Sequence, residues 1–384
     1  TFARNRDKDM KRKLLLFLLA WLSIQLTFSQ DKKEITVLYL IPFHISDSHI
    51  NISEISTELD IFDVSALQMI GFWEGAKLGL STYEYSDKKI EVIVRDITTD
   101  EVKLKQILED DRLMKDVDLI IGPFYGSLIP IAAQYANEKK IMIVNPFSIQ
   151  EAGIETNPYL YKLKPNVSRK PQMVKELILD SIPNYKVHLW CENKEDENVK
   201  LYIEFFENQE IAYQIDEIKP YTHRLNLDLG FHKHHVIIAL FNNPTVVMNQ
   251  MRLFDNATEG ISYSLIFPEE WLNFSVLDED FYSLKNLYYF TNCFVEANEK
   301  SARFIEDYVA IYQTPCQLER FSFQGYDITR YFIDLYFAQQ NPNLVEFTPL
   351  SYRFKFNKWS QGGFENEIIR LIKIENFEKR EIGK

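Results

Sequence analysis

The sequence predicts an α/β protein made of two doubly wound parallel-sheet lobes that are joined by three crossovers. Strand-like apolar runs alternate with helical segments, an order typical of a parallel sheet covered by helices. The alternation stops near Pro165 and then begins again, so two such units follow each other. A length of 384 residues fits about two domains, and an apolar content of 46% is sufficient for two packed cores.

The first unit begins with an apolar run at residues 35–41 that ends at Pro42 and predicts a strand. The elements that follow are a helix over 64–83, a strand over 90–97, a helix over 101–113, a strand over 117–121, a helix over 128–138 and a strand over 141–144. Gly71, Gly75 and Gly79 share one face of the first helix. We expect this face to lie close on the sheet, and close packing against another helix is the alternative.

The second unit shows the same alternation after Pro165. Its predicted helices cover 170–181, 199–207 and 245–254, and its predicted strands cover 186–191, 211–218, 235–241, 263–267 and 286–291. Two further helices are predicted over 302–312 and 322–339, and strand-like runs at 352–356 and 367–374 close the chain.

The N-terminal residues have the pattern of an export signal. Lys11, Arg12 and Lys13 precede an apolar run at 14–22, and Thr27 and Ser29 supply small residues for a cleavage site. We therefore expect residues 1–29 to be upstream sequence and a signal peptide, and the mature protein to be periplasmic. An uncleaved membrane anchor is the alternative. No later apolar run is long enough for a membrane span, so none is expected after cleavage.

Net charge, glycine content and cysteine content limit the partners, binding motifs and disulfides that can be expected. Lys and Arg total 43 against 56 Asp and Glu, and the net charge of -13 disfavours nucleic acid and anionic membranes as partners. With only 12 Gly, phosphate-binding glycine loops are scarce. Cys191, Cys293 and Cys316 are expected to be isolated thiols, although pairing of Cys293 with Cys316 is left open.

Four motifs in register carry a resemblance to a known family. They are the strand and turn at 117–123 with Ser127, the strand and loop at 141–148, the segment 157–161 with Pro165, and Gly325-Tyr326-Asp327 at the start of an apolar helix. Together they resemble the type I periplasmic binding proteins, the leucine/isoleucine/valine-binding class. The closing segment 354–374 resembles a subgroup of cell-envelope proteins that are substrate-binding-like.

This resemblance implies how the chain is divided. Lobe one would hold residues 35–163 plus 297–341, and lobe two would hold 164–296 plus 342–376. The three crossovers would lie near 162–168, 292–298 and 341–348. Such crossovers form a hinge, and hinge closure around a ligand is a known mode of conformational switching.

The resemblance also implies a function. The protein would be an exported, non-catalytic solute-binding protein of an ABC transporter, which holds a small-molecule ligand in the inter-lobe cleft for transport or sensing. A transporter permease would be its partner. The alternative is a ligand-free scaffold that regulates a cell-envelope protein, such as one of peptidoglycan synthesis, by protein–protein contact.

A ligand in such a fold binds beyond the carboxyl ends of the strands. We expect the cleft to be lined by Tyr125, Ser127, Phe147, Ser148, Tyr161, Asn242 and Tyr326. Ser127, near a predicted helix N-terminus, would suit a carboxylate or another anion, and a plain N-cap is its alternative role. Asn242 could equally be a turn residue. Phe147 and Tyr125 should narrow the cleft relative to an amino-acid binder.

Motifs for catalysis or metal binding are missing from the sequence. It contains no His-Glu-x-x-His, Cys-x-x-Cys, Gly-x-Ser-x-Gly or Walker motif, so we expect no enzyme and no cofactor. Three histidines within residues 232–235 have metal-ligand chemistry, but they precede a buried strand and are expected to hold no metal. The acidic run at 278–280 is expected to be a solvated turn.

Overall fold

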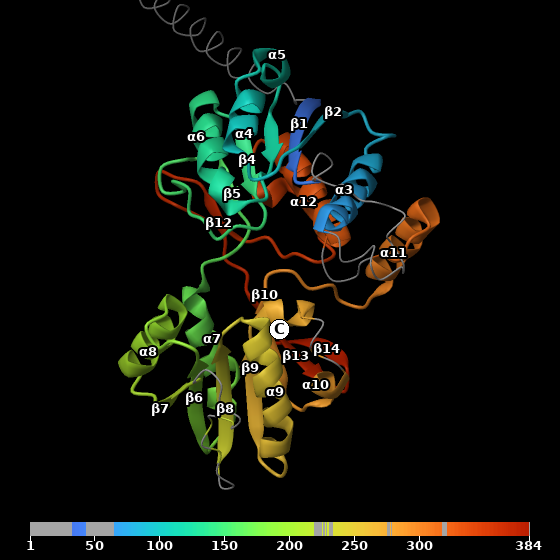
Figure 1. Cartoon of the computed structure of the whole chain (residues 1–384). Helices are drawn as coiled ribbons and strands as arrows, with labels where there is room; N and C mark the ends of the chain where they lie inside the picture. The colour runs from blue at the N-terminus through green and yellow to red at the C-terminus, as the bar shows by residue number, and fades with distance from the viewer. Residues whose placement is uncertain are drawn as a thin grey trace, which may run out of the picture.

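A computed structural model describes residues 33–43, 65–218, 225, 227, 229, 233–274, 277, 279–316 and 321–383. These residues form two lobes, each built on a seven-stranded sheet, and several chain segments run between the lobes (Figure 1). The signal-peptide prediction for residues 1–29 lies outside the described residues. In the part of the chain that the structure describes, no helix is long and apolar enough to cross a bilayer.

The sheet of lobe one has the strand order β11-β12-β5-β4-β3-β1-β2. Its strands are β1 (Glu34–Ile41), β2 (Lys89–Asp96), β3 (Leu119–Ile121), β4 (Met142–Asn145), β5 (Leu160–Lys162), β11 (Phe356–Lys358) and β12 (Phe364–Asn366). All neighbours pair in parallel except β11 and β12. On β1, Val37 and Tyr39 face one hydrophobic cluster while Leu38 and Leu40 face the other, so both faces are covered.

Helices cover both faces of this sheet. They are α3 (Ser65–Ser81), α4 (Glu101–Leu108), α5 (Asp111–Met114), α6 (Ile129–Lys139) and α12 (Phe321–Phe337), with short 3-10 turns η2 (Gly126–Leu128) and η6 (Pro342–Leu344). The remaining helix of the lobe, α11 (Glu299–Tyr312), packs on α3 and α12. The single helix predicted over 101–113 is two helices, because the Asp110 side chain accepts hydrogen bonds from the amides of Arg112 and Leu113 and begins α5.

Gly75 and Gly79 of α3 face the helix α12 and not the sheet. A Cβ on Gly75 would lie 1.8 Å from the carbonyl oxygen of Ser322, and a Cβ on Gly325 would lie 1.9 Å from that of Phe72. The backbones of α3 and α12 are therefore in direct contact, which only glycine permits. The expectation of a close helix–sheet contact is wrong, and the helix-pair alternative is correct.

The sheet of lobe two has the order β14-β13-β10-β9-β8-β6-β7. Its strands are β6 (Tyr185–Cys191), β7 (Tyr213–Glu217), β8 (His234–Leu240), β9 (Tyr263–Phe267), β10 (Leu287–Thr291), β13 (Arg370–Glu375) and β14 (Glu378–Ile382). The helical elements are α7 (Lys170–Leu177), α8 (Glu197–Asn208), α9 (Pro244–Thr258), α10 (Glu279–Ser283), η3 (Val167–Arg169), η4 (Leu179–Ser181) and η5 (Glu269–Asn273). β13 and β14 are antiparallel additions to an otherwise parallel sheet. The predicted two-lobed α/β fold is confirmed, with mixed rather than purely parallel sheets.

The closing segment does not divide as expected. Residues 342–376 were assigned to lobe two, but β11 and β12 belong to the sheet of lobe one, where Phe364 pairs with Tyr161 on β5. The chain therefore crosses between β12 and β13, and not near 341–348.

Aromatic packing explains this difference. The rings of Phe364 and Tyr161 stack at 4.5 Å, and Phe356 contacts Tyr161 edge to face at 5.4 Å. Lys162 on β5 also forms a largely buried 2.9 Å ion pair with Glu365 on β12. These contacts hold β11 and β12 on lobe one, and nothing in the local sequence specifies the partner strand.

Candidate functional site

A cavity of about 850 Å³ lies between the two lobes and is lined by residues of both. Its walls come from the loops that follow β3 and β4 in lobe one and β6, β8 and β9 in lobe two. These loops leave the carboxyl ends of parallel strands, which is where open α/β sheets bind ligands. The volume is within the range of small-molecule sites.

Aromatic rings form the wall of lobe one. Phe124 follows β3, Phe147 follows β4, and their rings meet edge to face at 5.0 Å. Phe72 on α3 and Phe321 on α12 each lie 4.8 to 6.0 Å from one of these two rings. This packing fixes both loops on the helix pair of lobe one.

The turn at Ser148 is held by hydrogen bonds within its own loop. The side chain of Asn145, the last residue of β4, accepts from the Ser148 amide at 3.0 Å and donates to the Ser148 carbonyl at 3.1 Å. The Ser148 hydroxyl accepts from the Gln150 amide at 3.0 Å. A Cβ on Gly126, in the loop after β3, would lie 2.7 Å from that hydroxyl oxygen, so this position has no room for a side chain. Sequence reasoning missed Asn145, whose only signal is a polar residue at the end of a buried strand.

Lobe two supplies polar side chains from three loops. Asn242 follows β8, Glu269 and Glu270 follow β9 on η5, and Glu192 follows β6. Thr291, the last residue of β10, donates a 2.8 Å hydrogen bond to the carboxylate of Glu269. Glu269 therefore connects the pocket to the strand from which the chain leaves lobe two for α11.

The indole of Trp271 anchors η5. Its Nε1 donates to the carbonyl of Phe241 at 2.9 Å, and the residue is fully buried. This bond joins η5 to the loop after β8, so the two segments that carry Asn242 and Glu270 are fixed relative to each other.

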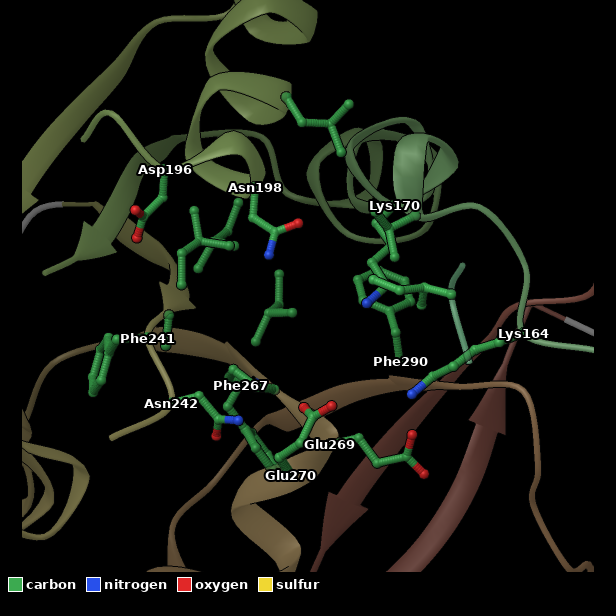
Figure 2. A pocket seen from close by; sticks show the side chains of 18 of the residues that line it. Lys164, Lys170, Asp196, Asn198, Phe241, Asn242, Phe267, Glu269, Glu270 and Phe290 are labelled. Atoms are coloured by element: carbon green, nitrogen blue, oxygen red, sulfur yellow. The ribbon is translucent and has the colours of Figure 1, made fainter. Parts of the chain in front are cut away.

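Two lysines reach the pocket from the first crossover and the start of α7. Figure 2 shows Lys164 and Lys170 on the side of the pocket that also holds Glu269 and Glu270. The Lys170 ammonium lies 5.7 Å from the centroid of the Phe290 ring. Burial lowers the pKa of Lys170, while Glu270 and Glu269 oppose that shift and Lys164 adds to it. Sequence reasoning missed both lysines, since no strand was predicted over 160–162 before Lys164, and Lys170 begins a helix.

Four of the seven predicted site residues line the pocket: Tyr125, Phe147, Ser148 and Asn242. Ser127 is exposed on η2, beside the pocket-lining Gly126 but not in the lining itself. Tyr161 is buried in the core of lobe one against Phe364. Tyr326 packs on Phe304 and Phe347, away from the pocket lining.

The histidine-rich segment lies within lobe two. His188 joins Asp216 at 2.5 Å and His235 at 2.9 Å, and all three side chains are buried on adjacent strands. His234 bonds to Ser262 and Ser264, while His232 and Asp278 lie outside the described residues. Within the described ranges, no group of three or more His, Cys, Asp or Glu residues has an arrangement that could hold a metal ion.

Comparison of sequences identifies no relative: no family model matches the chain, and no curated protein matches it. Solved structures, however, resemble it over most of its length.

Three of these structures illustrate the likeness. A putative branched-chain amino acid ABC transporter protein from Rhodospirillum rubrum superposes with a TM-score of 0.62 at 12% identity, over 91% of this chain and 100% of the other. A branched-chain amino acid ABC transporter periplasmic ligand-binding protein from Burkholderia xenovorans gives 0.59 at 10% identity, over 89% and 91%. A branched-chain amino acid transporter substrate-binding protein from Streptococcus pneumoniae, in complex with isoleucine, gives 0.53 at 15% identity, over 92% and 100%. With its two lobes and its pocket at the carboxyl ends of the strands, this chain has the fold of the type I periplasmic binding proteins.

Proposed function

We propose that the protein is an exported, non-catalytic solute-binding protein, which holds a small molecule between its lobes for transport or sensing. The observation that carries this proposal is the 850 Å³ cavity lined by strand-end loops of both lobes. Apolar walls with a few converging polar groups are typical of small-molecule sites. The solved structures of similar fold include a substrate-binding protein in complex with isoleucine.

The connections between the lobes support a hinge. The chain leaves lobe one after β5, returns after β10 and crosses again between β12 and β13. Asn292 in the second crossing donates a 3.2 Å hydrogen bond to the carbonyl of Leu163 in the first, so two crossings lie side by side. Rotation about these segments would close the pocket over a ligand.

Export and delivery belong to the same proposal. A protein exported by the predicted signal at residues 1–29 would meet its solute outside the cytoplasm and pass it to a transporter permease. Expression from Met10 in a bacterial host, followed by N-terminal sequencing of the periplasmic fraction, tests this. An intact N-terminus in the membrane fraction would reject the export part of the proposal.

Ligand-dependent stabilisation across a metabolite panel tests the binding function. A ligand at 100 times its dissociation constant should add about 2.7 kcal/mol to the unfolding free energy. Asn242→Trp should abolish this gain because Asn242 lines the pocket at the start of α9. Asn256→Trp, at the exposed other end of that helix, should leave the gain unchanged. A gain that survives Asn242→Trp would place the ligand elsewhere.

A ligand-free scaffold that contacts a cell-envelope protein is the second candidate function. The observation in its favour is the wall of lobe one. Phe124 and Phe147 occupy the loops after β3 and β4, and Ser127, the hydroxyl expected to bind a ligand, lies outside the pocket lining. If this function holds, no metabolite will stabilise the protein. Cross-linking in intact envelopes to a peptidoglycan-synthesis protein should then be insensitive to Asn242→Trp.

A further inference from the structure

We propose that the ligand is an amine-bearing amphiphile, whose ammonium group is held by lobe two and whose apolar part is covered by lobe one. This inference rests on the proposed solute-binding function and specifies the chemistry of that site. It follows from how polar and apolar side chains are divided between the two walls of the pocket.

The wall of lobe one is uncharged. Among the described residues, lobe one contributes Phe124, Tyr125, Gly126, Phe147, Ser148 and Ile149 to the lining. Ile149 is 63% exposed although it is aliphatic, so an apolar surface faces the open pocket. Closure onto an apolar group would remove that surface from water, which is favourable in proportion to the apolar area covered.

Every charged residue in the described lining comes from the other side of the pocket. Lobe two and the crossover that enters it contribute Lys164, Lys170, Glu192, Asp196, Glu269 and Glu270. Four carboxylates thus stand against two ammonium groups, so the wall is acidic. A charged ligand group would find its partners on lobe two, and a cation would balance the excess of carboxylates.

The two ends of this acidic wall differ. Figure 2 shows Lys164 and Lys170 beside Glu269 and Glu270, while Asp196 and Phe241 lie on the opposite side of the view. The lysines therefore offset Glu269 and Glu270, and the end at Asp196 keeps its negative charge. This end is where an ammonium group from a ligand would be stabilised.

The thiol of Cys191, at the end of β6, is buried close enough to Asp196 to be affected by its charge. Burial raises the pKa of Cys191 to about 11, and the carboxylates of Glu217, Asp196 and Asp216 add to the shift. The carboxylate part of this shift reflects negative charge near the end of β6, whereas the burial part would disfavour a charge of either sign.

Aromatic rings also belong to the pocket lining. Lys170 already lies over the face of Phe290 within the pocket, at 5.7 Å from the ring centroid. Phe241 and Tyr202 belong to the lining that also contains Asp196. Both rings are largely buried, and a ligand carboxylate at this end would face the carboxylate of Asp196.

Three compounds that share a phenyl group and differ in charge test the proposal. Isothermal titration at pH 7 and low salt compares 2-phenylethylamine, phenylalanine and 3-phenylpropanoate. We expect the amine to bind at least tenfold more tightly than the carboxylate, and its affinity to fall with added salt. Tightest binding of the carboxylate or the amino acid, or equal binding of all three, would overturn the proposal.

Variants with matched controls test where the ammonium group and the apolar part of the ligand bind. Asp196→Asn keeps an N-cap residue for α8 and should weaken amine binding several-fold. Glu195→Gln removes an exposed carboxylate that pairs with Lys200 outside the lining, and should have no effect. Ile149→Ser should weaken binding of the amine, and Ile311→Ser on α11, which is 59% exposed, should not. If Asp196→Asn leaves the affinity unchanged, the ammonium site is wrong.

Native mass spectrometry of the protein purified from its own host separates this inference from the proposed function. A bound amine supports both. A bound anion or neutral compound rejects the amine and leaves the solute-binding function intact. A ligand-free protein that none of the three compounds and no member of the metabolite panel stabilises rejects both.

Discussion

Arg370 and Glu381 form a buried ion pair of 2.7 Å where the chain makes its third crossing between the lobes. The same Arg370 guanidinium donates to the carbonyls of Phe294 and Ser351, which belong to the neighbouring segments at the hinge. Glu381 on β14 also receives both Nη atoms of Arg353, each at 2.8 Å. Arg353 precedes β11 of lobe one, so this fork joins the two lobes.

Removing the negative charge of Glu381, at the centre of this network, should lower the stability of the protein. In Glu381→Gln, the Arg370 guanidinium, only 3% exposed, loses one of its two carboxylate partners. We expect the unfolding free energy in urea to fall by about 3 kcal/mol. The matched control is Glu375→Gln, since Glu375 pairs with Lys373 and Arg380 at 41% exposure and its loss should change the unfolding free energy little. Equal losses in the two variants would show that burial of the pair does not matter.

The contact between α3 and α12 should not tolerate a methyl group. Gly325→Ala places a Cβ 1.9 Å from the Phe72 carbonyl oxygen, so the two backbones must separate, at a cost of about 3 kcal/mol or more. Gly79→Ala meets its nearest backbone atom at 3.2 Å and should stay within about 1 kcal/mol, because alanine favours the helix. Thermal unfolding of both variants checks this, and a stable Gly325→Ala protein would contradict the close packing.

Asp327 should make stability depend on pH in a defined direction. Burial raises its pKa to about 6, although the carboxylate accepts hydrogen bonds from Ser351, Leu350 and Tyr352. Because the folded state holds this proton more tightly than the unfolded chain, the contribution is greatest below pH 4 and is lost as the pH rises through about 6.

Asp327→Asn isolates this contribution. The difference in unfolding free energy between the natural protein and the variant should shrink by about 2 kcal/mol between pH 4 and pH 7. Parallel pH profiles in urea titrations would show that Asp327 does not take up a proton on folding.

The three thiols should be unreactive in the folded protein. Burial raises the pKa of Cys191 and Cys316 to about 11 and that of Cys293 to about 12, so little thiolate forms at pH 8. Ellman's reagent should therefore label the native protein slowly, and it should label all three thiols rapidly in denaturant. Rapid labelling of one thiol without denaturant would reveal an accessible site.

Much of the fold follows from the sequence because local periodicity reports what a segment must bury. Continuous apolar runs such as the one at β1 specify strands covered on both faces, and the pause near Pro165 separates the two units. Pocket residues that directly follow strands, such as Phe147 and Asn242, could be predicted for the same reason: the end of a strand places them at the edge of a sheet.

Only the tertiary structure decided which segments meet. Tyr161 was predicted to line the cleft. Its ring instead stacks on that of Phe364, about 200 residues later in the chain, and is buried in the core of lobe one. Lys170 reaches the pocket because α7 begins beside Phe290. The local sequence around Lys170 does not indicate that these two residues, 120 positions apart in the chain, are neighbours in space. Periodicity determines which face of an element is buried, whereas strand partners and pocket walls depend on contacts between residues far apart in the chain.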